Sequence, residues 1–72
     1  MTHYKVSVVI EREDDWYVAF CPEVGTASQG ATIEEALSNL QEATELYLEE
    51  FPLKEKPHPI MATFEVENVV KA

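Results

Sequence analysis

Residues 32–52 constrain the fold more than any other stretch, because they predict a helix with a defined start and a defined end. Thr32 and Glu35 have the spacing of a capping box, which makes Thr32 the N-cap and Ile33 the first helical residue. Pro52 ends the pattern because proline cannot continue a helix. One face of this helix is apolar along its length and comprises Ile33, Ala36, Leu37, Leu40, Ala43, Tyr47 and Phe51. The rest of the chain must supply a surface for that face.

Alternating apolar and polar residues predict strands on both sides of the helix. Residues 4–11 have the two-residue period of a half-buried strand, and residues 16–20 repeat it after a charged hairpin turn at 12–15. Residues 26–29 are short, polar and β-permissive, which predicts a third strand at an exposed edge. Alternation returns in residues 60–70 as a last strand.

These elements predict a single α+β domain spanning residues 1–72, since a chain of 72 residues has room for only one core. The order is βββαβ. A right-handed crossover through the helix predicts one four-stranded mixed sheet with strand order 3-2-1-4, covered on one face by the helix. The opposite face is expected to show a mixed surface that favours self-association. The residues expected there are Val9, Tyr17, Ala19, Cys21 and Met61.

The charge of the chain is strongly negative and unevenly spread. The formal net charge is −9, and between Arg12 and Lys54 there are ten acidic residues and no lysine or arginine. Such a belt repels phosphate, so direct binding of nucleic acid is not expected. Two interpretations stay open, namely a surface matched to a basic partner and a general contribution to solubility.

The single Cys21 excludes an internal disulfide, and the first residues lack the pattern of a signal peptide. No apolar run approaches the roughly 20 residues of a membrane span. We therefore expect a cytoplasmic protein that does not contact a membrane.

The two glycines that precede the helix do not form a phosphate-binding loop. After Gly30 come Ala31, Thr32 and Ile33, where a Walker loop needs a lysine followed by serine or threonine. A dinucleotide-binding motif would need a third glycine. We expect Gly25 to serve the bend between two strands, and Gly30 to serve the turn into the helix.

No catalytic, cofactor or metal site is expected. Cys21 closes a hydrophobic strand, which is typical of a small buried residue, and its spacing to His3 and His58 fits no zinc pattern. Asp14 and Asp15 belong to a charged hairpin tip that lacks the pattern of a calcium loop. An enzymatic alternative would have to rest on Cys21 or on this aspartate pair.

The predicted helix breaks the usual rules of helix charge. It carries six glutamates and no lysine or arginine. Glu45 repels Glu49 one turn further on, and Glu49 and Glu50 lie at the negative end of the helix dipole, at a cost of about 0.3 to 1 kcal/mol each. Leu46 lies outside the apolar face. Such violations often mark a binding surface.

Three stretches of the sequence form a combined motif, namely YKVSVVIE at the first strand, DDWYVAFCPEV at 14–24 and GTASQGATIEEALSNLQEATELYLEE at 25–50. With this combination the sequence resembles the HicB family, the antitoxin half of HicA and HicB toxin-antitoxin pairs. The resemblance implies a single HicB-like domain with a partial RNase H-like fold. It also implies a cytoplasmic, non-enzymatic protein that binds a small basic HicA-type mRNA interferase and blocks its RNA site. Many members continue into a DNA-binding segment, and we expect this sequence to be a short form without one.

The predicted partner surface combines the acidic side of the helix with the short strand at 26–29, which offers an edge for strand addition. Its residues are Thr26, Ser28, Gln29, Glu35, Glu42, Glu45, Leu46 and Glu49. The alternative is a stand-alone HicB-like interaction module that forms only homo-oligomers and has no toxin partner.

Overall fold

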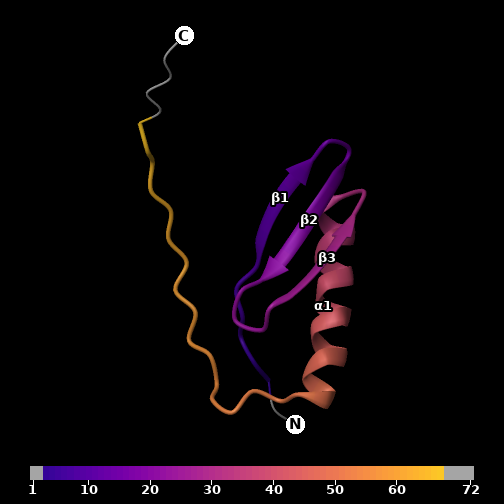
Figure 1. Cartoon of the computed structure of the whole chain (residues 1–72), viewed down its shortest axis with the longest axis vertical. Helices are drawn as coiled ribbons and strands as arrows, with labels where there is room; N and C mark the ends of the chain where they lie inside the picture. Colours follow the sequence, from indigo (N-terminus) through magenta and orange to yellow (C-terminus); the bar gives the residue numbers. More distant parts are fainter. Residues whose placement is uncertain (1–2, 68–72) are drawn as a thin grey trace.

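The computed structural model describes residues 3–67 and forms a three-stranded antiparallel sheet with one helix across it (Figure 1). The strands occur in the order β1-β2-β3. The elements are β1 (Val9–Glu13), β2 (Trp16–Cys21), β3 (Thr26–Gly30) and α1 (Ile33–Glu50). The fold is therefore βββα.

The predicted fourth strand is wrong. Residues 60–67 adopt no strand, and residues 68–70 of the prediction lie outside the described residues. The sheet is thus purely antiparallel with β1 at one edge, instead of a mixed sheet of order 3-2-1-4 that would make an RNase H-like fragment. The alternation of apolar and polar residues in 60–67 gives an extended segment two distinct faces, but it does not supply a neighbouring strand to pair with. The chain after α1 runs apart from the sheet and the helix (Figure 1). The radius of gyration is 15.0 Å, against about 11 Å for a compact chain of this length.

The first hairpin lies further along the chain than predicted. The first strand begins at Val9 and ends at Glu13, so residues 4–8 precede the sheet. The loop is the two-residue tip of Asp14 and Asp15, since Glu13 pairs with Trp16. Asp14 has a φ of 53°, which aspartate tolerates better than most residues. The Nε of Arg12 donates to the carbonyl of Asp14 at 3.2 Å and fixes this tip.

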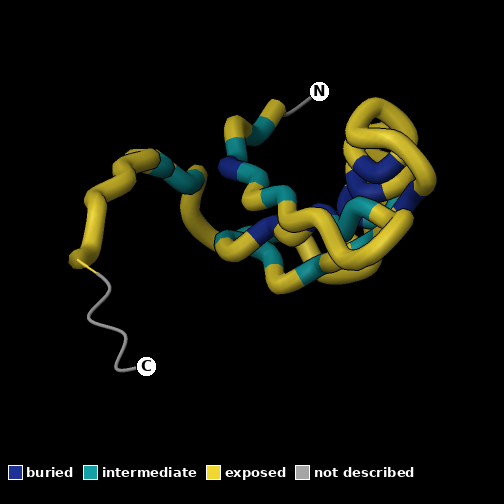
Figure 2. Tube along the Cα trace, turned by 90° about the horizontal axis from the view of Figure 1, so that it is seen from above, coloured by how far each residue is buried: buried dark blue, intermediate teal, exposed yellow. Residues whose placement is uncertain are grey.

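The core lies between α1 and the sheet and consists of small residues. Ala19 and Cys21 from β2 and Ala36 from α1 are fully buried, and Leu40 is 2% exposed. Figure 2 shows buried positions gathered where the helix passes over the sheet. Confirming one prediction, the lone Cys21 is a buried free thiol.

The two faces of β2 are the reverse of the prediction. Ala19 and Cys21 were expected on the open face, together with Tyr17, yet all three belong to the core or pack against it. The open face carries Trp16 and Phe20, which are 50% and 42% exposed. Alternation assigns residues to two faces without saying which one the helix covers. The covered face is the one with small side chains, because a helix can approach closely only there.

Two further residues were predicted for the open face, namely Val9 and Met61, and they lie in different parts of the structure. Val9 pairs with Phe20 and is exposed on that face, as predicted. Met61 is exposed as well, but it belongs to the segment that forms no strand, so its assignment to the sheet was wrong.

The helix boundaries are as predicted, but only part of the predicted apolar face is buried. Ile33 begins the helix, and the buried positions are Ala36, Leu40 and Thr44. Several residues of the predicted apolar face remain exposed, namely Ile33, Leu37, Tyr47 and Phe51. The rings of Tyr47 and Phe51 pack on each other with centroids 5.0 Å apart. The sheet is too narrow to cover the whole predicted face.

The capping box is confirmed at the start of α1. The Thr32 hydroxyl accepts from the Glu35 amide at 3.0 Å, and the Glu35 carboxylate accepts from the Ala31 amide at 2.7 Å. Two backbone donors that the helix cannot satisfy are satisfied by these side chains.

Replacing the cap should weaken the whole fold. We expect Thr32→Ala to lower the free energy of unfolding by about 1 kcal/mol, because the Glu35 amide loses its acceptor. Urea unfolding followed by circular dichroism measures this. Thr32→Ser, which keeps the hydroxyl, is the control and should lose much less; equal losses for both variants would contradict the capping role.

The two glycines have different tasks. Gly25 has a φ of 90°, and its amide donates to the Cys21 carbonyl at 2.7 Å, which confirms the predicted bend. Gly30 allows close approach of β3 to the helix start, because a Cβ there would lie 2.6 Å from the Ala36 amide nitrogen.

Within residues 3–67, α1 is not apolar enough to cross a membrane.

Candidate partner-binding surface

Four of the predicted contact residues form one surface on the side of α1 that faces away from the sheet. Glu42, Glu45, Leu46 and Glu49 are all exposed, and they fall within about 100° of helix circumference. We call these four residues the acidic face. Leu46 is 59% exposed and places an apolar side chain among the three carboxylates.

The predicted residues of β3 do not join this surface. Thr26 and Ser28 pair with Cys21 and Ala19, so they lie on the helix side of the sheet. The Thr26 hydroxyl lies 2.7 Å from the Thr44 hydroxyl and forms a hydrogen bond between β3 and α1. Both threonine side chains are therefore engaged within the chain.

Gln29 lies on the opposite side of the sheet, with an exposed side chain. Its backbone carbonyl accepts a hydrogen bond from the side-chain Nδ2 of Asn39 at 2.9 Å. This bond ties β3 to the helix and occupies a carbonyl that strand addition would otherwise use. Glu35 is likewise engaged, because its carboxylate completes the capping box. The structure thus brings together the helix residues and separates them from the β3 residues.

A groove not foreseen from the sequence opens beside the acidic face, which contributes Glu45 and Glu49 to its lining. It lies between the N-terminal residues 3–8 and the helix, and it has a volume of about 1120 Å³. Its lining is largely apolar and includes Val6, Val8, Leu37, Leu40 and Leu48. Sequence periodicity does not predict this groove, because the groove forms where the helix extends only in part over residues 3–8, which precede the first strand.

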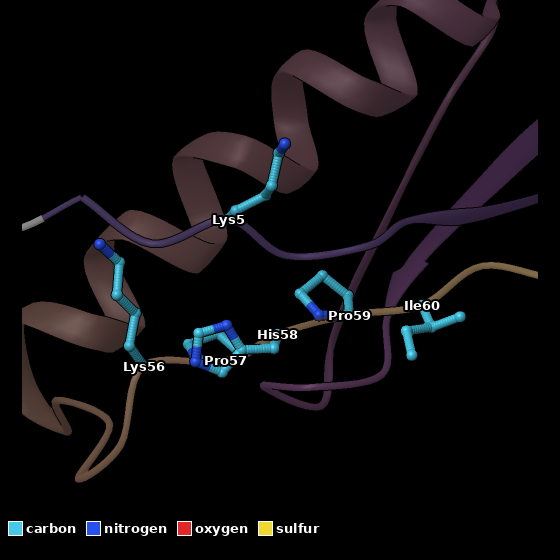
Figure 3. Close-up of a pocket in the computed structure, with 6 residues that line it drawn as sticks. All are labelled: Lys5, Lys56, Pro57, His58, Pro59 and Ile60. Carbon is cyan, nitrogen blue, oxygen red and sulfur yellow. The ribbon is translucent and has the colours of Figure 1, made fainter.

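A smaller cavity of about 500 Å³ lies between the N-terminal and C-terminal segments. Figure 3 shows its lining, with Lys5 from the N-terminal segment and Lys56 and His58 from the segment after the helix. It collects two of the five lysine and arginine residues of the chain. Lys5 also lines the larger groove, together with Glu45 and Glu49 of the acidic face.

Two curated proteins resemble this chain over most of its length. A UPF0150 protein of Synechocystis sp. is 47% identical over 58 residues, which cover 78% of this chain and 73% of the relative. A UPF0150 protein of Helicobacter pylori is 39% identical over 67 residues, which cover 85% of this chain and 93% of the relative. The chain belongs to the UPF0150 family. No protein-family model and no solved structure matches it. The UPF0150 name is compatible with a HicB-like protein and by itself assigns no activity.

The sequence analysis missed a hydrogen-bonded carboxylate in this UPF0150 chain. Glu23, in the loop between β2 and β3, accepts from the Ser7 hydroxyl at 2.7 and 2.9 Å and from the Ser7 amide at 3.1 Å. The Cys21 thiol lies 3.8 Å from the same carboxylate. The hydrogen bond from the Ser7 side chain is the main cause that lowers the pKa of Glu23. These bonds hold the N-terminal segment against the loop.

The Glu23 bonds should make stability depend on pH. Because the folded protein favours the ionised carboxylate, its contribution is complete above the ordinary pKa of 4.5 and is lost as the pH falls through the lowered value. We expect Glu23→Gln to lower the free energy of unfolding at pH 7, and the difference from the wild type to shrink below pH 4.5. Urea titrations followed by the fluorescence of Trp16 measure both proteins. A difference that stays constant from neutral to strongly acid pH would contradict this role.

The residues considered for enzymatic chemistry lie in two different places in the described chain. Cys21 is fully buried, and its hydrogen-bond partner is the Glu23 carboxylate. Among residues 3–67, no group of three or more histidine, cysteine, aspartate or glutamate side chains is placed to hold a metal ion. Asp14 and Asp15 form the exposed hairpin tip.

Proposed function

We propose that this UPF0150 protein is an antitoxin-like binding protein of the HicB type, which neutralises a small basic HicA-type mRNA interferase. The observation that carries the proposal is the acidic face, where three carboxylates surround an exposed leucine on a helix without a single base. The resemblance of residues 4–50 to HicB antitoxins supports the same function. Membership of the UPF0150 family is compatible with it.

The electrostatics of the acidic face suit a basic protein. An RNA-cleaving toxin must hold RNA phosphates, so its RNA site carries lysine and arginine side chains. A patch of carboxylates attracts such a site over distances of about 10 Å at moderate salt and raises the rate of association. Bound there, the carboxylates take the place of phosphates. The toxin would then be inhibited by competition with RNA.

Binding would also relieve a cost that the free helix carries. Glu45 and Glu49 lie one turn apart and repel each other, and the last turn of α1 contains acidic but no basic residues. Basic side chains of a partner would neutralise this repulsion. Leu46 would add an apolar contact at the centre of the patch, where burial contributes most to affinity. Leu46 would then provide specificity, and the carboxylates would raise the rate constant of association.

The proposed protein acts in the cytoplasm and catalyses no reaction. It acts by covering a surface of its partner, so its functional residues are exposed and do not converge on a single site. Direct contact with nucleic acid is not part of the proposal, since the acidic belt repels phosphate.

Co-purification tests the proposal. The chain is expressed with a short basic protein encoded beside it, and the complex is captured through a tag on the basic protein. We expect the two to copurify at low salt and to separate as salt rises, because the attraction is electrostatic. Failure of the pair to associate at any salt concentration would contradict the proposal.

A second candidate function is a homo-oligomeric interaction module without a toxin. It is favoured by the apolar side chains that a monomer leaves exposed, including Trp16 and Phe20 on the open face of the sheet. The two candidates differ in what the acidic face does. In the second, reversing its charges would leave every interaction of the protein unchanged.

A further inference from the structure

The groove between residues 3–8 and α1 reaches down to the core. Leu40, Thr44 and Cys21 are buried, and all three also line the groove. Val6 and Val8 form its opposite wall and are only partly buried, although they pack against the core. The groove is therefore an open continuation of the hydrophobic core. Both of its walls carry apolar residues, and Lys5 on one side and Glu45 and Glu49 on the other also line it.

The groove exists because α1 extends only in part over the first segment of the chain. The helix packs on β3 and β2, so it covers the residues that lead into β1 only in part, and Val6 and Val8 stay half-buried. The buried apolar core of the described chain consists of Ala19, Cys21, Ala36 and Leu40. That is a small core for a domain of this length, and additional apolar cover would stabilise it.

The same chain carries an apolar segment that has no surface to pack on. Ile60, Phe64 and Val66 alternate along residues 60–66 and are 91%, 86% and 75% exposed. The segment is extended and runs apart from the sheet and the helix, as both Figure 1 and Figure 2 show. Large apolar side chains this exposed usually mark an interaction site.

We propose that the groove of one copy takes residues 60–66 of a second copy, so that two copies exchange their C-terminal segments. Each copy supplies one groove and one apolar segment, so a dimer with twofold symmetry satisfies both. Ile60, Phe64 and Val66 of one protomer pack on Val6, Val8 and Leu48 of its partner. This inference does not depend on the toxin.

The connection between helix and segment favours a second copy over the chain's own groove. Pro52, Pro57 and Pro59 restrict the backbone to extended conformations and oppose a return along the helix. Short, stiff connections of this kind favour exchange between copies.

The charge of the connecting segment also permits the approach. From Lys54 to Val66 the chain has two lysines and two acids, Glu55 and Glu65, so this stretch has no net charge. This segment can therefore come close to a second acidic chain without the repulsion that two copies of the belt would feel. Of the acidic face, Glu45 and Glu49 line the groove and would lie beside the inserted segment, whereas Glu42 and Leu46 do not line it and stay free in the dimer.

Mass measurement by light scattering after size exclusion tests the exchange. We expect the full chain to have twice the 8.2 kDa of one copy, and Phe64→Glu to reduce the dimer to monomers while circular dichroism stays unchanged. Two leucines on the same helix form a matched pair. Leu48→Glu, inside the groove, should raise the dimer dissociation constant at least tenfold, whereas Leu46→Glu, outside it, should leave the dimer intact.

Isotope-filtered NMR on a mixture of labelled and unlabelled chains identifies which copy fills the groove. We expect contacts between the Phe64 ring of one chain and the Leu48 methyl groups of the other. A monomeric wild type, a dimer unaffected by Phe64→Glu, or contacts that occur only within one chain would each overturn the proposal.

Discussion

Gly30→Ala should be the most damaging single substitution in the chain. An alanine Cβ at this position would lie 2.6 Å from the Ala36 amide nitrogen and 2.9 Å from Glu35 atoms, closer than unbonded atoms approach. The obstacle is backbone of the first helical turn, which cannot rotate away. The strand and the helix must separate, and the capping box and the buried Ala36 lie at that contact.

Such overpacking costs about 1 to 3 kcal/mol or more, and small domains have only a few kcal/mol of stability. We expect the melting temperature to fall by about 10 °C or more, with part of the protein unfolded at 37 °C. Thermal unfolding followed by circular dichroism measures this. Ala27→Val adds bulk to the same strand at an exposed position and is the control, expected to change little. A Gly30→Ala variant as stable as this control would show that β3 and α1 are not in close contact.

Reversal of the acidic face should have the largest effect on function. We expect Glu42→Lys, Glu45→Lys and Glu49→Lys together to weaken binding of a basic HicA-type toxin by about 100-fold or more at low salt. Attraction becomes repulsion at three exposed positions that do not contribute to the core. Isothermal titration calorimetry at several salt concentrations measures the affinity.

The matched control changes the net charge equally at another place. Glu11, Glu13 and Asp15 are exposed in the first hairpin, away from the helix, and their triple change to lysine adds the same positive charge. We expect this variant to keep most of the wild-type affinity. Equal weakening by both triple variants would mean that total charge, and not the acidic face, governs the interaction.

The elements that depend on local chemistry could be predicted from the sequence. The capping box fixed the start of α1, Pro52 followed its end, and the charged residues at 12–15 marked the first hairpin to within two residues. These features are decided by a few neighbouring residues. The acidic face followed from the same periodicity, because exposed positions on a helix are known once its buried positions are known.

Features that depend on contacts between distant residues could not be predicted. Alternation in β2 gave two faces, and only the approach of the helix decided that Ala19 and Cys21 lie inside. The prediction of a last strand was wrong for a similar reason. The alternation in residues 60–67 favours an extended conformation, but it cannot show whether a neighbouring strand is there to pair with. The bonds from Ser7 to Glu23 join residues 16 positions apart, and no local signal links them.

Inhibition of RNA cleavage tests the central claim most directly. A fixed amount of the HicA-type toxin cleaves a labelled RNA while the wild-type chain or the variant with a reversed acidic face is added. Cleavage should stop when about one wild-type chain is present for each toxin, and it should continue at the same ratio of the variant. Undiminished cleavage with excess wild type, or equal inhibition by both proteins, would contradict the claim that the acidic face neutralises a toxin.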